Sequence, residues 1–596
     1  MADLILWNSI ARRRRSPADD FPDNGLAILK AYVENHGYQV EVIDWARGSQ
    51  WEKMTPRLLA RLNRLMAVAI LGSRSFSPGL NKAISRLISP LFIMTQESMS
   101  AIQGHFEAKL IRSLAKYVSD SGCRVAGIKA WYGEAYKSAR FFARCLRELD
   151  PEVLIVVGGP HPTTYRQAVL EDEIFDIAVA GEGERVLVGI LELAQQAKTR
   201  KELLDEITRE ASQGNLKNVI YRCDGKVEIS PPEETDANDK VIPVYDNFES
   251  KTRIHVVVES LGCPWGKCNF CTHSCTYKKY SIRQPEAVVE EIEGMLAKGI
   301  GIFRFSGSST SLSHARRIAE VLEERGLRIS YSMFGRAESR AAEKEVYDKV
   351  VDSYRQLLRS GFRSIFLGAE SAMDIINDRV MNKGITRSDI VATSKAMREA
   401  SRIEGLPMDI GISLIYPAPT LGLVSLERLK TENIRLVEEI EPDSVLVSPP
   451  APFPGSAWFR EKDRFGFELG DSFVRDMLEY DYILYKPLFL WPEIGIRLEG
   501  MSQRQIFEEC ESLRQALDQR GIATEVTDVQ FLMLRAAGYE GKEGVLRFKK
   551  QTQLDLLSCD YRWINALQLK VNQASLALAS ANKDKIWSPI SGNTKI

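Results

Sequence analysis

The sequence alternates short apolar runs with amphipathic segments, and this alternation occurs in two separate series. In the first 200 residues the apolar runs have strand length, and the segments between them, such as 26–36 and 134–149, have helical spacing. This order is typical of a doubly wound parallel sheet. The expected strands of the first series are 4–8, 40–44, 125–130, 153–157 and 175–180. Residues 1–200 therefore predict an α/β domain of the flavodoxin-like, Rossmann type.

A second series occupies residues 251–460. Helical segments such as 285–298 and 313–325 separate its apolar runs, which favours a parallel β/α barrel or a large part of one. The expected strands are 255–260, 301–306, 328–334, 364–367, 409–416 and 444–447. Barrels of this type hold their chemistry at the carboxyl ends of the strands. We therefore expect a partial (β/α)6 barrel with a site at that end.

Three segments lie outside the two series. Residues 201–250 are polar and contain SPPEETDANDK, so we expect a linker there. Residues 46–122 are rich in helix formers, and we expect them to cover a site. Residues 461–596 predict a mainly helical region that caps the barrel mouth and contacts the substrate. Its expected features are helices at 502–519 and 529–536 and an aromatic pocket wall at 480–492.

Composition and charge narrow the class of protein. Apolar residues make up 44% and charged residues 27%, as in soluble globular proteins, and no apolar run reaches the roughly 18 residues that span a bilayer. The apolar stretch at the start precedes Arg12–Arg15, the reverse of a secretory signal, so we expect a cytoplasmic protein. A net charge of −1 does not indicate a nucleic-acid partner. Arg12–Arg15 is interpreted as a solvated loop or as a run that holds a phosphate.

Three of the nine cysteines lie within nine residues, directly after the first expected strand of the second series. Cys263, Cys268 and Cys271 form the run LGCPWGKCNFCTH. In a reducing compartment, clustered thiols indicate iron–sulfur or zinc binding rather than disulfides. A structural zinc ion would need a fourth ligand, which Cys275 or His273 could supply. Three thiolates on a four-iron cluster would instead leave one iron open.

This cysteine run, at the mouth of a partial barrel, resembles the signature of the radical S-adenosylmethionine (SAM) superfamily. Phe270 matches the aromatic position of the family pattern Cys-x3-Cys-x-aromatic-Cys, which usually lies near the adenine. The sequence departs from that pattern because four residues separate Cys263 from Cys268. Gly266 could absorb the extra residue, since glycine adopts backbone angles that other residues avoid. The resemblance implies a [4Fe-4S] cluster held by Cys263, Cys268 and Cys271.

Other segments that resemble the family imply contacts to SAM. The Ser-Gly-Ser-Ser stretch at 306–309 occupies the place of the Gly-Gly-Glu stretch that receives the amino group of SAM. FLGAES, ISLIYPAPTLG and SPPAPFPGSAWF resemble the cobalamin-binding branch of the superfamily, and in the first of these a polar residue commonly contacts the ribose. Arg336 could pair with the SAM carboxylate through its planar fork. The residues implied in SAM binding are Phe270, Ser306, Gly307, Ser308, Arg336, Glu370 and Ser371.

A flavodoxin-like domain in front of the barrel resembles the cobalamin-dependent class, and the stretches GGPHP and AGEGE match it. No Asp-x-His-x-x-Gly motif occurs, and members of this class generally lack it as well. Ligands of open α/β sheets lie beyond the carboxyl ends of the strands. The expected cobalamin contacts at those ends are Asn8, Ser9, Trp131, Tyr132, Gly158, Gly159, Pro160, His161, Gly181, Glu182 and Gly183. The alternative is a domain that keeps the fold without the cofactor.

The resemblance implies an enzyme in which a reduced cluster cleaves SAM to a 5'-deoxyadenosyl radical, with cobalamin as methyl carrier. The expected reaction is methylation of an unactivated carbon in a small-molecule or natural-product substrate. Oxidation, ring contraction or cyclisation, with or without cobalamin, is the first alternative. The second is a non-catalytic iron–sulfur or zinc protein whose metal site Cys275 closes. Expected partners are the substrate and an external electron donor of flavodoxin or ferredoxin type, with no membrane span and no nucleic acid.

Overall fold

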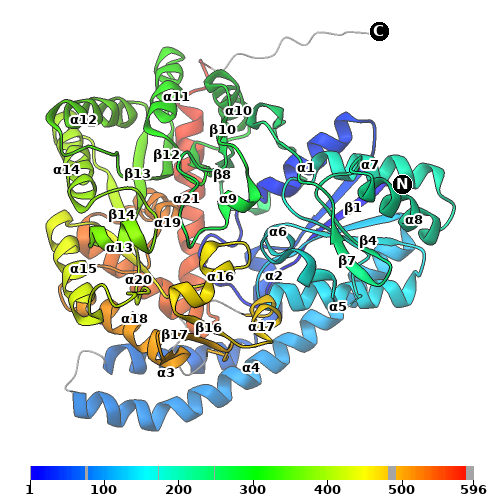
Figure 1. Ribbon diagram of the computed structural model, residues 1–596, viewed down its shortest axis with the longest axis horizontal. Helices are drawn as coiled ribbons and strands as arrows, with labels where there is room; N and C mark the ends of the chain where they lie inside the picture. The colour runs from blue at the N-terminus through cyan, green and yellow to red at the C-terminus, as the bar shows by residue number, and fades with distance from the viewer. Residues whose placement is uncertain (1, 74–77, 172, 247, 481–490, 586–596) are drawn as a thin grey trace.

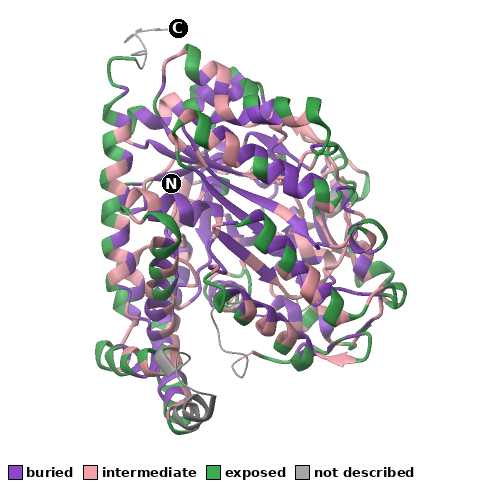
Figure 2. Ribbon diagram, turned by 90° about the vertical axis from the view of Figure 1, so that its left-hand side faces the viewer, coloured by how far each residue is buried: buried purple, intermediate pink, exposed green. Residues whose placement is uncertain are grey.

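The computed structural model describes the chain except residues 1, 74–77, 172, 247, 481–490 and 586–596, and the side chains of 72–86, 274 and 275. The expected aromatic pocket wall at 480–492 lies mostly outside the described residues. Two sheets lie side by side, with the first on the right of Figure 1 and the barrel on the left. Figure 2 shows that the strands are mostly buried and that exposed residues concentrate on the helices and loops around them.

The first sheet has seven strands in the order β2-β1-β3-β4-β5-β6-β7. Strands β1 to β5 are parallel, which confirms the predicted doubly wound sheet, and β6 and β7 are antiparallel additions at one edge. The strands are β1 (Leu4–Asn8), β2 (Val40–Asp44), β3 (Val125–Lys129), β4 (Leu154–Gly158), β5 (Ile177–Val179), β6 (Val219–Cys223) and β7 (Lys226–Ile229). The helices that flank this sheet are α1 (Asn24–Asn35), α5 (Glu134–Leu149), α6 (Pro160–Tyr165), α7 (Glu184–Gln196) and α8 (Arg200–Ser212).

Helices cover both faces of this sheet because the side chains of each strand alternate between them. In β1, Leu4 and Leu6 belong to the core shared with α1, α7 and α8. Ile5 and Trp7 belong to the core on the opposite face, where the Trp7 ring lies 4.8 Å from the ring of Phe142 in α5. Burial on two faces explains why these strands appear in the sequence as continuous apolar runs.

The expected linker at 201–250 is partly wrong, because its first half belongs to the first sheet. Residues 200–212 form α8, and β6 and β7 form a hairpin that extends the sheet beyond β5. The hairpin turns at Asp224 and Gly225, which both have positive φ, as a two-residue hairpin turn requires. Only the stretch after β7 connects the two sheets.

The second sheet has six parallel strands and is an open partial barrel, as predicted. Its edges are β8 and β15, which do not pair with each other. The strands are β8 (Ile254–Val257), β11 (Ile302–Phe305), β12 (Ser330–Gly335), β13 (Phe362–Glu370), β14 (Asp409–Ile415) and β15 (Ser444–Ser448). The helices around them are α10 (Pro285–Ala297), α11 (Leu312–Glu324), α12 (Lys344–Arg359), α13 (Asp374–Arg379), α14 (Arg387–Glu404) and α15 (Leu426–Ile440).

The C-terminal region differs from the expected cap, because one of its helices lies at the opposite end of the barrel. Helix α19 contacts β12 and β13 near their amino ends, where Asp528 accepts hydrogen bonds from Arg304 Nε (2.9 Å) and Ser332 Oγ (3.1 Å). Arg535, at its end, lies 2.7 Å from Asp409, the first residue of β14. The helices of this region are α16 (Ala457–Arg460), α17 (Phe473–Leu478), α18 (Gln503–Asp518), α19 (Asp528–Ala536), α20 (Gly541–Ser558) and α21 (Arg562–Ser580). Of these, α16 lies beside the cysteine loop, since Trp458 N donates to Asn269 O at 3.0 Å.

Most of residues 46–122, expected to cover a site, form a long helical hairpin at the edge of the molecule, whereas Ala46 and Trp51 at the start of the segment line a cavity beside the first sheet. The hairpin consists of α3 (Arg57–Ser73) and α4 (Pro78–Asp120), and the short α2 (Gly48–Met54) precedes it. Helix α3 packs against α20, and the end of α4 packs against α5. None of the helices within the described residues is long and apolar enough to cross a membrane.

Candidate functional site

The three clustered cysteines lie on the loop that follows β8 and β9 (Ser260–Leu261) at the carboxyl end of the barrel strands. Burial raises the pKa of the Cys268 thiol to about 12, and Lys383 opposes that shift while the two neighbouring thiols add to it. Burial likewise raises the pKa of Cys271. No three ligating side chains among the described residues converge as a single metal ion requires.

Backbone contacts fix the cysteine loop to the segment after α13. Asn269 N donates to Met381 O (2.9 Å), and Trp265 Nε1 donates to Asn382 O (2.7 Å). A Cβ on Gly384 would lie 2.3 Å from the Trp265 ring, so this close approach requires glycine. Gly266 has a φ of +60°, which agrees with its expected role in accommodating the extra residue of the loop.

Two cations face the cysteine loop. Lys383 is buried, its Nζ lies 2.9 Å from Glu370 Oε1 and 5.8 Å from the centre of the Phe270 ring, and it interacts electrostatically with Cys268. The Arg336 guanidinium lies 4.4 Å from the centre of the Trp265 ring and donates to Lys383 O (2.5 Å) and Gly384 O (2.6 Å). Three thiolates on an iron–sulfur cluster carry negative charge, which these cations would offset. The donor set and its surroundings thus fit a cluster.

Of the residues expected at SAM, Phe270 lies in this loop, and Arg336 and Glu370 lie beside it. Glu370 ends β13 with a φ of +62°, and its second oxygen accepts from Ser413 Oγ at 3.1 Å. Ser371 is fully buried and its Oγ accepts from the backbone N–H of Met373, and its contact with SAM stays a prediction. Its contacts are those of a turn residue.

The loop after β11 is held by a residue that was not predicted from the sequence. Glu259 is buried and accepts hydrogen bonds from Gly307 N (2.9 Å) and Thr310 Oγ1 (2.7 Å), and burial raises its pKa. Ser308 Oγ lies 2.8 Å from His273 Nδ1, on the far side of the cysteine loop. A carboxylate within the apolar run HVVVES was the available signal. Glu259 therefore positions the Ser306–Ser308 loop.

Gly307→Ala should weaken SAM binding by about tenfold and destabilise the protein by about 1–3 kcal/mol. The added Cβ would lie 2.1 Å from Glu259 Oε1 and 2.3 Å from Ser260 Oγ, so the loop must move. Calorimetric SAM titration and denaturant unfolding measure the two effects. Gly294→Ala, a glycine with open space in α10, is the matched control. Normal SAM affinity in a destabilised Gly307→Ala protein would contradict a role of this loop in SAM binding.

The predicted cobalamin edge and the predicted SAM loop line one cavity of about 320 Å³. From the first sheet it is lined by the glycine-rich ends of β4 and β5, and from the barrel by the loop after β11. The predicted residues that line it are Gly158, Gly159, Gly181, Glu182, Gly183, Ser306 and Ser308. Gly159 and Gly181 have φ of +96° and +100°, so glycine is required for the backbone as well as for the space. Because glycines line the cavity, it leaves room for a cofactor at the ends of β4 and β5.

A second cavity, of about 480 Å³, adjoins the first. Asn8, Ser9 and Trp131 line it, and both cavities share Lys129 and Ser306. Trp131 Nε1 donates to Asn8 Oδ1 at 2.8 Å, which holds the indole at the cavity wall. The Lys129 ammonium lies 4.5 Å from the centre of the Trp131 ring and 2.6 Å from Asp23. The ends of β1 and β3 thus lie at the same edge of the sheet as the ends of β4 and β5.

Tyr132, Pro160 and His161, also predicted to contact cobalamin, line neither of these two cavities. His161 is fully buried, its Nε2 lies 2.7 Å from Leu478 O in α17, and its ring contacts Tyr132, Tyr136 and Tyr165. Burial lowers the pKa of His161 to about 4. These contacts place it in the core that joins the first sheet to the C-terminal region.

Acidification from pH 7 to pH 5 should lower the free energy of unfolding of the wild type by about 2 kcal/mol more than that of the His161→Gln variant. In that range the unfolded chain protonates His161 at its ordinary pKa of 6.5, whereas the folded protein keeps the ring neutral. Stability therefore falls as the pH drops from 6.5 toward 4. Denaturant unfolding at both pH values measures the difference. Parallel pH profiles for the two proteins would disprove the burial argument.

A cluster of charged residues closes the side of the first cavity and was not predicted. Lys240, from the segment after β7, forms ion pairs with Glu182 and Glu184. Tyr277, from the barrel side, donates to Glu182 Oε1 at 2.7 Å. No sequence pattern marks Lys240 as part of a site. These contacts join the two sheets across the cavity.

Two family models match the chain, one on each sheet. A B12 binding domain model matches residues 102–191, which include β3 to β5 and their glycine-rich ends. A Radical SAM superfamily model matches residues 258–410, which include the cysteine loop and β11 to β13. The two matches coincide with the two halves of the candidate site.

Curated relatives are similar over about half of the chain. The anaerobic magnesium-protoporphyrin IX monomethyl ester cyclase of Rubrivivax gelatinosus is 24% identical over 374 residues, which cover 60% of this chain and 61% of the relative. An uncharacterized methyltransferase of Pyrococcus horikoshii is 26% identical over 319 residues, which cover 51% of this chain and 64% of the relative. Each match thus spans less than two thirds of the relative's length.

Solved structures share the fold over most of the chain. The radical SAM methyltransferase TsrM from Kitasatospora setae, with tryptophan substrate and a SAM analog bound, has a TM-score of 0.58 at 14% identity and covers 89% of this chain and 92% of its own. OxsB, a cobalamin-dependent SAM radical enzyme with aqua-cobalamin and SAM bound, has a TM-score of 0.55 at 13% identity and covers 99% and 82%. The chain thus matches a B12 binding domain model in front of a Radical SAM superfamily model, and it shares the fold of TsrM and OxsB.

Proposed function

We propose that this protein is a cobalamin-dependent radical SAM enzyme that transfers a methyl group to a carbon of a small-molecule substrate. One observation carries the proposal: the glycine-rich ends of β4 and β5 and the Ser306–Ser308 loop line the same cavity. A corrinoid on the first sheet and SAM on the barrel would therefore occupy one continuous space. The tryptophan bound to TsrM supports a small molecule as the class of substrate.

Cys263, Cys268 and Cys271 are the proposed cluster ligands, and Glu370 with the 306–308 loop would receive SAM. When bound, the cluster supplies the electron that cleaves SAM, and cobalamin carries the methyl group. Lys383 and Arg336 offset the charge of the thiolates, and Arg336 also holds the backbone of residues 383 and 384 against the cysteine loop. An external donor of flavodoxin or ferredoxin type would supply the electron.

The residues around the first cavity would also help to exclude water from the proposed reaction space. Glu259 keeps the 306–308 loop in place, and the Lys240, Glu182 and Tyr277 contacts close the cavity between the two sheets. Exclusion of water protects a reactive radical from side reactions. In the proposed enzyme, the first sheet positions the corrinoid and the barrel positions SAM.

Cyclisation is the second candidate reaction, because two of the curated relatives are cyclases. The Rubrivivax gelatinosus and Cereibacter sphaeroides cyclases match 60% and 57% of this chain. Both candidate reactions begin with reductive cleavage of SAM, so the residues above serve either one. Isotope-labelled methyl SAM separates them: label in the product supports methyl transfer, and an unlabelled, oxidised or cyclised product supports the alternative.

The first experiment is anaerobic purification with iron–sulfur reconstitution and added hydroxocobalamin, followed by absorption spectra and metal analysis. We expect iron with near-stoichiometric cobalt. Iron without cobalt would favour a radical SAM enzyme whose first domain is empty. Zinc without iron would overturn the radical chemistry.

Cys275→Ala tests the non-catalytic alternative. If Cys275 closed the metal site, its replacement would release the cluster. We expect the variant to keep its iron and its SAM cleavage, since three cysteines suffice for a cluster with an open iron. Loss of the cluster in this variant would support a closed, non-catalytic site.

A further inference from the structure

The helical hairpin α3–α4 is the largest element that the proposed chemistry does not use. It is inserted between β2 and β3 and extends along the edge of the molecule (Figures 1 and 2). Its inner side is packed: Met66, Ala67 and Phe92 are buried in a core with Leu554 of α20. The hairpin therefore packs against the rest of the protein through its inner side.

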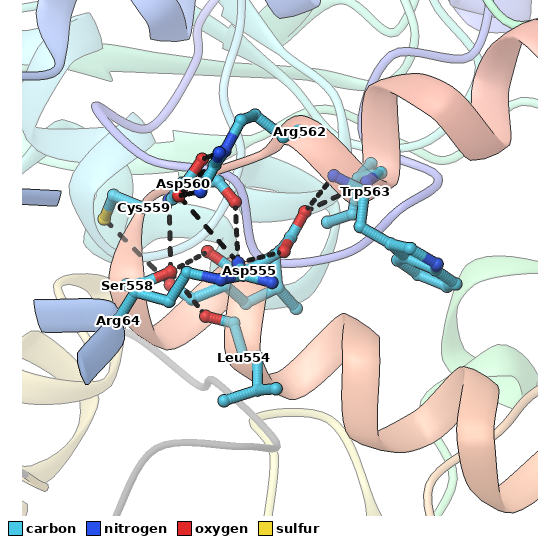
Figure 3. Close-up of polar contacts among 10 residues, drawn as sticks. Arg64, Leu554, Asp555, Ser558, Cys559, Asp560, Arg562 and Trp563 are labelled. Atoms are coloured by element: carbon cyan, nitrogen blue, oxygen red, sulfur yellow. Dashed lines mark hydrogen bonds and ion pairs between the residues drawn. The ribbon is translucent and has the colours of Figure 1, made fainter. Parts of the chain in front are cut away.

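A partly buried ion pair anchors the hairpin in a fixed position. Arg64 Nη1 of α3 lies 2.6 Å from Asp555 Oδ1 of α20. The other oxygen of Asp555 accepts the backbone N–H groups of Trp563 and Ile564, each at 2.9 Å, at the start of α21 (Figure 3). These contacts hold α3 against the α20–α21 turn. The outer side of the hairpin consequently keeps a constant orientation toward solvent.

That outer side carries large apolar side chains with helical spacing. In α3, Leu58 is 80% and Leu65 is 71% exposed, with Leu62 between them. In α4, Leu87 is 79% and Met94 is 63% exposed, with Leu91 between them. Both sets follow the spacing i, i+4, i+7, which places each set on one helix face. Clusters of exposed large apolar side chains are typical of interaction surfaces.

The charge of the same segment has a single sign. From Lys53 to Gln96 the sequence contains no Asp or Glu, although the whole chain has a net charge of −1. The cations of this segment are Lys53, Arg57, Arg61, Arg64, Arg74, Lys82 and Arg86. Arg57 and Arg61 are exposed and form no ion pair with another described residue. With Arg562 they line a cavity of about 290 Å³ at the base of α3, to which Glu52 and Asp560 also contribute.

We propose that the α3–α4 hairpin binds the surface of an anionic phospholipid bilayer. The exposed leucines and Met94 would enter the boundary between headgroups and acyl chains, and Arg57 and Arg61 would contact lipid phosphates. A basic helix with a narrow apolar face is the usual composition of an interfacial, non-spanning membrane element. A second copy of the chain is a poorer occupant, because it would bring together two basic segments that contain no Asp or Glu.

Vesicle flotation of the reconstituted holoenzyme under anaerobic conditions tests this surface. We expect flotation with vesicles of equimolar phosphatidylglycerol and phosphatidylcholine, little with phosphatidylcholine alone, and release at high salt. Arg57→Gln with Arg61→Gln should weaken binding by about 25-fold, at about fivefold for each cation. Leu58→Glu with Leu65→Glu should abolish it. The assay needs neither SAM nor substrate, so its outcome is independent of the proposed methyl transfer.

Matched controls are Leu569→Glu, an exposed leucine on α21, and Lys344→Gln, an exposed cation on α12, which should both bind like the wild type. Equal binding to both vesicle types would overturn the proposal. So would unchanged binding in the hairpin variants. If sedimentation shows a dimer that Leu58→Glu with Leu65→Glu dissociates, and no vesicles bind, the surface is a contact between two copies of the chain and the membrane proposal is wrong.

Discussion

Replacing Cys268 with alanine should leave a folded protein that holds little iron and cleaves SAM at less than about one hundredth of the wild-type rate. Loss of a residue that only supports a metal ligand typically costs about 10–100-fold, and loss of the ligand itself should cost more. Lys383 and the neighbouring thiols interact with this side chain, so Cys268 lies at the centre of the proposed ligand set. Iron analysis and quantification of 5'-deoxyadenosine measure the effect.

Cys223→Ala is the matched control. Cys223 is a partly buried thiol at the end of β6 in the other sheet, away from the cysteine loop. We expect this variant to keep its iron and its rate. A Cys268→Ala protein with a full complement of iron would show that the ligands of the metal lie elsewhere.

Most parallel strands of both sheets could be predicted because they are buried on two faces and appear in the sequence as apolar runs. The six barrel strands were expected in the right order, and their observed bounds differ by a few residues. The β6–β7 hairpin was missed although the sequence signals it, since Asp224-Gly225 stands between two short runs of strand-forming residues. Its polar surroundings made the segment look like a linker.

The position of the C-terminal helices could not be predicted, because residues far apart in the sequence decide it. Asp528 contacts Arg304 and Ser332, which precede it by about 200 residues, and Arg535 contacts Asp409. Periodicity indicates that 529–536 is helical, but not which end of the barrel it approaches. Helix α19 is almost entirely buried, which agrees with its packing against the amino ends of the barrel strands.

Some features of the candidate site could likewise be predicted from the sequence, and others could not. The cysteine loop and the glycine-rich strand ends are local patterns, and the sequence was sufficient to select them. Glu259, Lys240 and Lys383 are single polar residues whose roles depend on groups that reach them from other segments. Conversely, His161 belongs to a matching motif, yet its ring is enclosed by tyrosines in the core.

Gly158→Leu should lower the cobalt content at least about tenfold and leave the iron content unchanged. Gly158 ends β4 and lines the cavity shared by the two sheets, and its φ is one that other residues adopt. The nearest atom to an added Cβ is Val179 Cβ at 3.9 Å, so leucine is tolerated by the backbone and fills the cavity. A tenfold loss of affinity corresponds to about 1.4 kcal/mol, less than a blocked cofactor site should cost.

Gly294→Leu, at an open position in α10, controls for the larger side chain and should bind cobalt normally. The proposed mechanism separates two activities in the Gly158→Leu protein. Because Gly158 belongs to the first sheet and the cluster ligands to the barrel, SAM cleavage to 5'-deoxyadenosine should persist while methyl transfer is lost. A variant that binds cobalt fully would place the corrinoid outside this cavity. A variant that loses cobalt but still methylates would show that methyl transfer does not require the corrinoid.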